Sequence, residues 1–123
     1  MATPQDIYRF SSTYPRWVGD HTNVEWDGDV AEIVLPFLDR HNDYIGIFVS
    51  RREDGSLQMS DGGEIFEFGA KANEAIRWCL YRFGVALSDE LHIETHATKE
   101  TFHERLHAMI QAMIIASAMI GDQ

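Results

Sequence analysis

The segment Asn23–Phe37, NVEWDGDVAEIVLPF, decides the fold class of this chain. Asp27-Gly28 is a two-residue turn signal between two runs of β-forming residues, Val24–Trp26 and Val30–Leu35. Because so short a turn joins only antiparallel neighbours, the segment predicts a β-hairpin within an antiparallel sheet.

The residues after the hairpin predict further strands. Tyr44–Ser50, YIGIFVS, is nearly continuous in apolar character, as expected of a central strand. Asp54-Gly55 then turns the chain back into Leu57–Ser60, LQMS. A last short strand is predicted at Leu91–Thr95.

Three other segments have helical patterns. Thr3 is a candidate N-cap ahead of Pro4, which predicts a short helix over residues 3–12. Residues 71–84 place apolar side chains on one face and end at a glycine, and a long helix is predicted from about Thr98 to Ile120. The sequence therefore predicts an α+β fold, with an antiparallel sheet of about four or five strands, helices packed on one face, and a long C-terminal helix.

Length and composition restrict the classes of protein to consider. The 123 residues, of which 45% are apolar, predict a single folded domain over residues 1–123. The single cysteine, Cys79, allows no internal disulfide and favours a reducing compartment. The N-terminus lacks the pattern of a signal peptide, and the longest apolar run, AMIQAMIIASAMI, is too short to span a membrane. We therefore expect a cytoplasmic protein without membrane contact.

The charge of the chain is strongly negative around the hairpin. The formal net charge is -10, which predicts repulsion from nucleic-acid phosphates, and no Lys or Arg occurs between Arg16 and Arg40. The candidate partner-binding residues are Asp20, Glu25, Asp27, Asp29 and Glu32. They form either a solvated edge that keeps the hairpin soluble or a negative surface that binds a basic protein.

The segment HERLH, His103–His107, fits the H-E-x-x-H pattern of zinc hydrolases. Histidines four residues apart on a helix project from one face and can bind one Zn²⁺. Catalytic zinc also takes a third protein ligand, and only Asp122 follows His107. That ligand would have to come from upstream residues: His92, Glu94 or His96. Because both motif histidines lie at the edge of the predicted apolar face, we expect two surface histidines, with no metal and no cofactor.

Two polar segments, LDRHND and SDGG, form another candidate site. In an extended segment, Asp39, His41 and Asp43 would alternate onto one side. The candidate residues are Asp39, Asn42, Asp43, Asp61 and Gly63. Their carboxylates could bind a divalent metal or serve as acid and base, although the Glu-x-Lys of restriction-type nucleases is absent. The alternative interpretation is that these side chains cap turns.

The last predicted helix is more apolar than one face requires. Its candidate dimer-seam residues are Met109, Met113, Ile114 and Ile120. Methionine adapts to irregular packing, so the same residues suit either the core of the chain or a homodimer seam.

Two polar segments in the middle of the chain have a distinctive composition and spacing: Pro36, Phe37, Asp39, Asn42 and Asp43, followed by Ser60, Asp61 and Gly63. With them, residues 30–118 resemble the domain of unknown function 1828, which occurs in bacteria and their phages. The segments FGVAL and ATKETFHERLHAMIQAM resemble later parts of the family, whereas Leu35 replaces a family threonine. The resemblance implies a phage or mobile-element context and no established activity. It implies no paired histidines at the last helix, which favours local variation there.

Two functional classes follow from these observations. The first is a small, acidic, non-enzymatic protein that binds and inhibits a basic nucleic-acid-handling protein of a bacterial host. An anti-CRISPR inhibitor that mimics nucleic acid and binds a CRISPR-Cas component, without itself binding nucleic acid, is its concrete form. The second is a metal-dependent hydrolase or nuclease-like module that uses Asp39, Asp43 and Asp61. A zinc hydrolase that uses His103 and His107 is the least favoured.

Overall fold

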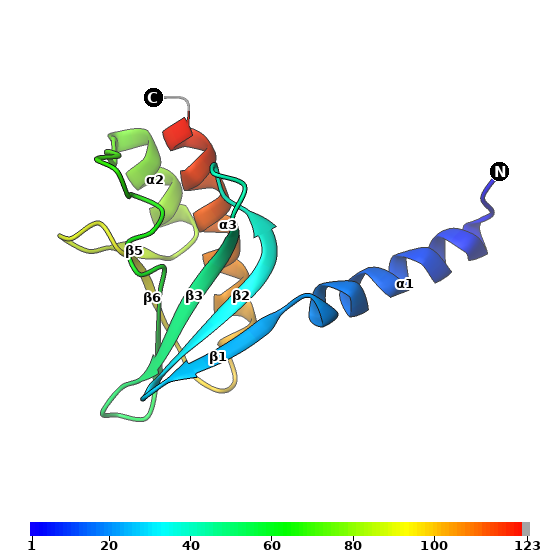
Figure 1. Cartoon of the computed structure of the whole chain (residues 1–123), viewed down its shortest axis with the longest axis horizontal. Coiled ribbons are helices and arrows are strands. Elements are labelled where there is room, and N and C mark those ends of the chain that lie inside the picture. Colours follow the sequence, from blue (N-terminus) through cyan, green and yellow to red (C-terminus); the bar gives the residue numbers. More distant parts are fainter. Residues whose placement is uncertain (122–123) are drawn as a thin grey trace.

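The strands and two of the helices form two layers, with the first helix outside both. A computed structural model of the chain describes residues 1–121. In chain order the elements are α1 (Pro4–Asp20), β1 (Asn23–Asp27), β2 (Val30–Leu38), β3 (Tyr44–Arg51), β4 (Leu57–Ser60), α2 (Glu74–Arg82), β5 (Ala86–Leu87), β6 (Ile93–Ala97) and α3 (Phe102–Gly121). The strands form one antiparallel sheet in the order β1-β2-β3-β4-β6-β5. Helices α2 and α3 pack beside each other against it, and α1 extends away from the body (Figure 1).

The predicted α+β architecture is confirmed, with six strands where about four or five were expected. The core lies between the sheet and α3. Ile33 pairs with Ile47, and Leu35 pairs with Ile45, so β2 and β3 turn a common apolar face toward the helices. Met109 of α3 is fully buried against this face. Complete burial of a side chain of that size contributes about 1.5–3 kcal/mol to stability.

Polar contacts fix α3 over the sheet at both ends. Near its start, the Arg105 guanidinium donates to the Gly84 carbonyl at 2.6 Å and to Thr95 Oγ1 at 2.7 Å. Near its end, Ser117 Oγ accepts a hydrogen bond from the Arg40 backbone N–H at 2.8 Å. α3 is the longest helix, with 20 residues, yet no helix within residues 1–121 is long and apolar enough to cross a membrane.

Several predicted boundaries were wrong, and for two of them local hydrogen bonds and backbone geometry explain why. α3 begins at Phe102 rather than near Thr98, because the Thr98 N–H donates to Thr101 Oγ1 at 2.9 Å and the Thr101 N–H to Thr98 Oγ1 at 3.3 Å. The last strand begins at Ile93 rather than Leu91, which has a φ of +63° that an extended strand does not accommodate. The two-residue strand β5 was not predicted.

α1 is longer than the predicted helix over residues 3–12. It starts as expected, with a capping box in which Thr3 and Asp6 exchange side-chain and backbone hydrogen bonds. The helix continues through Ser11, Ser12 and Thr13, whose hydroxyls donate to carbonyls of the preceding turn. It also continues through Pro15, which costs one backbone hydrogen bond, and ends at Asp20. No residue of α1 is buried.

Candidate binding surface

The β1–β2 hairpin positions the acidic residues. Asp27 pairs with Val30, so the turn residues are Gly28 and Asp29, one position beyond the predicted Asp27-Gly28. Gly28 has a φ of +63°, which glycine adopts without strain at the first position of a tight hairpin turn. In this register Glu25 lies directly opposite Glu32.

The sheet has one face without helices, which we call the open face. Its residues are Asn23, Glu25, Asp27, Val30, Glu32, Val34, Gly46, Phe48, Ser50, Gln58, Ser60, Glu94 and His96. Strand pairing aligns one row across it: Glu25, Glu32, Phe48, Ser60 and Glu94. The open face therefore presents four carboxylates and no Lys or Arg.

Of the five predicted partner-binding residues, Glu25, Asp27 and Glu32 lie on this open face. Asp29 lies in the adjoining turn, and Asp20 is the last residue of α1. The structure thus brings three of the five carboxylates onto one face, with a fourth at the tip of the hairpin.

The carboxylates of the open face have amide and glycine neighbours. Asn23 Nδ2 donates to Glu25 Oε1 at 3.2 Å, and Gln58 Nε2 donates to Glu94 Oε2 at 2.6 Å. The Glu32 side chain lies across Gly46, where any Cβ would collide with its carboxylate. Neutral donors orient carboxylates without cancelling their charge, so the negative potential of this face persists.

Glu64, in the loop after β4, is close enough to Glu32 of the open face for the charge of Glu32 to affect its pKa. Although the residue is exposed overall, partial burial raises the pKa of its carboxyl, and the charge of Glu32 is the next largest cause. Glu67, Asp61 and Asp39 raise it further. The loop after β4 therefore adds negative charge to that of the open face.

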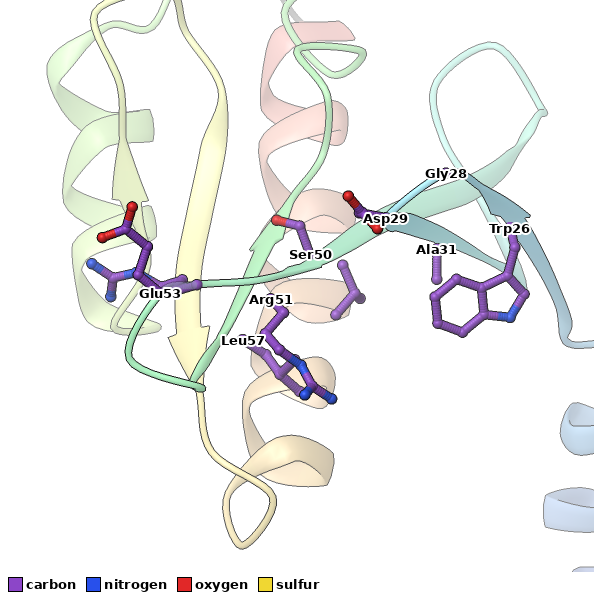
Figure 2. Close-up of a pocket in the computed structure, with 10 residues that line it drawn as sticks. Trp26, Gly28, Asp29, Ala31, Ser50, Arg51, Glu53 and Leu57 are labelled. Atoms are coloured by element: carbon purple, nitrogen blue, oxygen red, sulfur yellow. The ribbon is translucent and has the colours of Figure 1, made fainter.

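A hollow of about 510 Å³ lies at the hairpin end of the opposite face of the sheet (Figure 2). Trp26 stands beside its cross-strand partner Ala31, in a row that continues to Val49 and the buried Met59. The helices cover this row at Met59 and leave the Trp26 side chain 74% exposed. Asp29 and Glu53 also line the hollow, together with Arg51 and Arg52. Sequence reasoning missed Trp26, although the hairpin register already assigned it to the apolar side.

Asp39 caps a turn. Its Oδ1 accepts from the His41 and Asp43 backbone N–H groups, at 2.8 and 3.1 Å. Asn42 takes a φ of +62° in the same loop, as asparagine does more readily than most residues. Asp43 and Asn42 are exposed, and this loop contributes only Asp39 and Arg40 to a small hollow against α3.

The Asp61 carboxylate also accepts hydrogen bonds from backbone N–H groups, and the residue is completely buried. Its Oδ1 accepts from the N–H groups of Gly63 at 2.9 Å and Ile93 at 2.8 Å, and its Oδ2 from that of Ile65 at 3.1 Å. Burial raises the pKa of this carboxyl, against the three donors, which favour its charged form. Gly63 has a φ of +82° and packs under the ring of His92. Asp39 and Asp61 therefore tie loops to the sheet and do not converge on a pocket.

His103 and His107 are exposed on α3. His103 Nε2 lies 3.8 Å from Glu104 Oε1, and the two side chains are 78% and 73% exposed. Of the upstream residues considered as a third ligand, Glu94 and His96 belong to the open face, on the side of the sheet away from α3. Within residues 1–121 no three His, Cys, Asp or Glu side chains are placed to hold a metal ion.

The predicted seam residues of α3 lie in the core. Met109, Met113 and Ile120 are at most 6% exposed, and Ile114 packs partly buried against the same cluster. Core packing, the alternative interpretation of these residues, accounts for all four.

The comparisons with known proteins concern the body of the fold. No curated protein and no solved structure matches the chain. The model of the domain of unknown function DUF1828 matches residues 35–115, about two thirds of the chain. The match begins within β2, so α1, β1 and most of the acidic hairpin lie outside it. It confirms the resemblance found in the sequence, and the chain belongs to the DUF1828 family.

Proposed function

We propose that this chain is a non-enzymatic binding protein that covers a basic, nucleic-acid-binding surface of another protein. The observation that carries the proposal is the open face, where Glu25, Asp27, Glu32 and Glu94 lie without a Lys or Arg among them. Such a face raises the rate of encounter with a positive surface and repels nucleic acid itself.

The hairpin tip adds an exposed aromatic contact. Trp26 is 74% exposed beside a hollow that Asp29, Glu53, Arg51 and Arg52 also line, so the charges around the hollow balance (Figure 2). The indole face itself attracts Arg or Lys through the ring quadrupole. A basic partner surface thus finds carboxylates on the open face and an aromatic contact at the edge beside it.

The placement of the polar family residues favours binding over hydrolysis. Asp61 is fully buried and accepts three backbone hydrogen bonds, and Asp39 accepts two. A catalytic carboxylate must reach substrate or metal, and these two are engaged in holding loops.

The biological form of the proposal is an inhibitor encoded by a phage or mobile element. Its target would be a basic nucleic-acid-handling protein of the bacterial host, such as a CRISPR-Cas component. This form rests on the acidic charge and on the family resemblance in the sequence.

A charge-reversal pair tests the proposal. Immobilised protein is used to capture partners from bacterial lysate, with Asp27→Lys plus Asp29→Lys as the test variant. Asp89→Lys plus Glu90→Lys, in an exposed loop far from the hairpin in sequence, makes the same change of charge as the control. Melting temperatures of both variants verify folding.

We expect the wild type and the control to retain a basic nucleic-acid-binding protein that duplex DNA displaces, and the test variant to lose it. Retention by the test variant, or a complex that DNA leaves intact, would remove the proposal.

A further inference from the structure

α1 presents an apolar stripe that its own chain leaves uncovered. Ile7, Phe10, Tyr14 and Trp17 are between 46% and 58% exposed, and the helix stands clear of the sheet (Figure 1). A 17-residue helix without tertiary contacts is only marginally stable in water. The helix therefore needs a surface to pack against.

The spacing of the stripe specifies what kind of surface that is. Positions 7, 10, 14 and 17 alternate steps of three and four residues, which is the a and d pattern of a heptad repeat. This pattern makes a narrow seam for another helix. Tyr8 lies outside the seam and is 78% exposed, and Pro15 also lies outside it.

We propose that α1 packs antiparallel against α1 of a second copy of this chain. In that arrangement the two-fold axis passes at the level of Ser12, and the four seam residues of one helix face the same four residues of the other in reverse order. Ile7 of one copy lies opposite Trp17 of the other, and Phe10 lies opposite Tyr14. Each layer has a partner of suitable size, and the two-fold symmetry is that of most protein dimers.

The distribution of charge favours this partner and this orientation. Residues 1–20 hold two acidic residues, Asp6 and Asp20, and two basic ones, Arg9 and Arg16, so the whole net charge of -10 lies on residues 21–123. A parallel pair would bring two strongly negative bodies together. An antiparallel pair separates them by roughly the length of the helix, about 25 Å, which exceeds the screening length in physiological salt.

The same charges disfavour a membrane surface as the occupant. Helices that lie on membranes carry many Lys and Arg on the polar face, whereas α1 has two arginines balanced by two aspartates. The seam of two such helices buries roughly 1,000 Å² in total, at the lower limit of specific interfaces, so we expect a dissociation constant in the micromolar range.

Two tyrosines on the same helix provide a matched test. Sedimentation velocity of the full chain between about 5 and 200 µM, a range that brackets micromolar affinity, measures its mass. We expect a concentration-dependent dimer for the wild type and for Tyr8→Asp, and a monomer for Tyr14→Asp. The monomeric variant should also lose helical signal by circular dichroism, since α1 then has no partner.

A wild type that stays monomeric over this range would overturn the proposal, as would a dimer that Tyr14→Asp leaves intact. Binding of a monomeric wild type to vesicles of anionic phospholipid would overturn it in favour of a membrane. Equal loss of the dimer in both variants would show that general helix stability, and not the seam, is responsible.

Spin labels distinguish the two orientations. Labels at Gln5→Cys and, separately, at Ser12→Cys, each in a Cys79→Ser background, lie on the same outer side of α1. In the antiparallel pair the Gln5 labels are offset along the helix axis by roughly 20 Å and the Ser12 labels by none, so the first distance is longer. Equal distances at the two positions would indicate a parallel pair and overturn the proposed orientation.

Discussion

Glu25 and Glu32 face each other across β1 and β2, at directly opposite positions of the sheet. Side chains at such positions lie close enough to interact, and two like charges there reduce the stability of the sheet. The chain keeps this unfavourable pair on its open face, and Gly46 leaves room for the Glu32 side chain. A surface that gives up stability to hold charge is typical of a binding site, where a partner supplies the compensating charge.

The first prediction concerns this pair. Glu32→Gln keeps the shape of the side chain and removes the repulsion, so we expect it to raise the free energy of unfolding by about 0.2–1 kcal/mol at low salt. The gain should shrink in about 0.5 M NaCl, where charges are screened within a few ångströms. Urea unfolding at the two salt concentrations measures both effects.

The double variant Glu25→Gln plus Glu32→Gln is the control for that prediction. Either single substitution relieves the same repulsion, so the effects of the two should not add. Additive effects, or a gain insensitive to salt, would assign the change to something other than the pair.

The second prediction concerns pH. The pKa of Glu64 is raised above 4.5 in the folded protein, by burial first and by Glu32 next. The folded state therefore binds this proton more tightly than the unfolded state, and the ionised carboxyl costs stability at neutral pH. Glu64→Gln should be more stable than the wild type at pH 7. That advantage should decline as the pH falls through the raised pKa of Glu64 and vanish below the unfolded value.

A carboxyl-carbon NMR titration measures the same property directly. The midpoint of Glu64 should be higher than that of an ordinary glutamate, and Glu32→Gln should move it downward. If Glu32→Gln does not change the titration midpoint of Glu64, the charge of Glu32 is not a cause of the raised pKa.

The strands and the core could largely be predicted from the sequence because their signals are local. Turn residues at Asp27-Gly28 and Asp54-Gly55, together with runs of β-branched residues, specified the antiparallel strands. The apolar spacing of the last helix identified Met109 and Met113 among its buried side chains. The sequence did not predict that α1 would extend to Asp20 or that it would stand away from the body (Figure 1), since the second property depends on how the elements pack.

The candidate sites were harder to predict from the sequence, because the same residue types serve binding, catalysis and turn formation. Asp61 receives one of its hydrogen bonds from Ile93, 32 positions along the chain, so its structural role depends on the pairing of β4 with β6. The acidic hairpin could be predicted as a group. Which of these residues lie on the open face, in the turn or at the end of α1 could be assigned only from the strand register in the structure.

The third prediction tests the structural role of Asp61. Asp61→Ala leaves three backbone N–H groups without their acceptor, two of them buried, so we expect a loss of about 3 kcal/mol in the free energy of unfolding. Asp61→Asn retains one acceptor oxygen and should lose less. Hydrogen exchange should accelerate at the Ile93 and Gly63 amides in both variants.

Asp43→Ala is the matched control in the exposed loop, and it should change stability by no more than about 0.5 kcal/mol. If Asp61→Ala instead folds as stably as the wild type, the carboxyl is not needed to hold its loop, and a role in chemistry regains support.

The last prediction concerns the histidines of α3. Met109→Ala removes a fully buried side chain and should cost about 2–5 kcal/mol, whereas His107→Ala, two residues away at an exposed position, should stay within about 0.5 kcal/mol. Because a ligand that binds only the folded state raises Tm in proportion to its binding energy, excess Zn²⁺ should leave Tm unchanged. A Zn²⁺-dependent rise in Tm that His107→Ala abolishes would show that His103 and His107 do hold a metal, with a third ligand from outside residues 1–121 or from another copy of the chain.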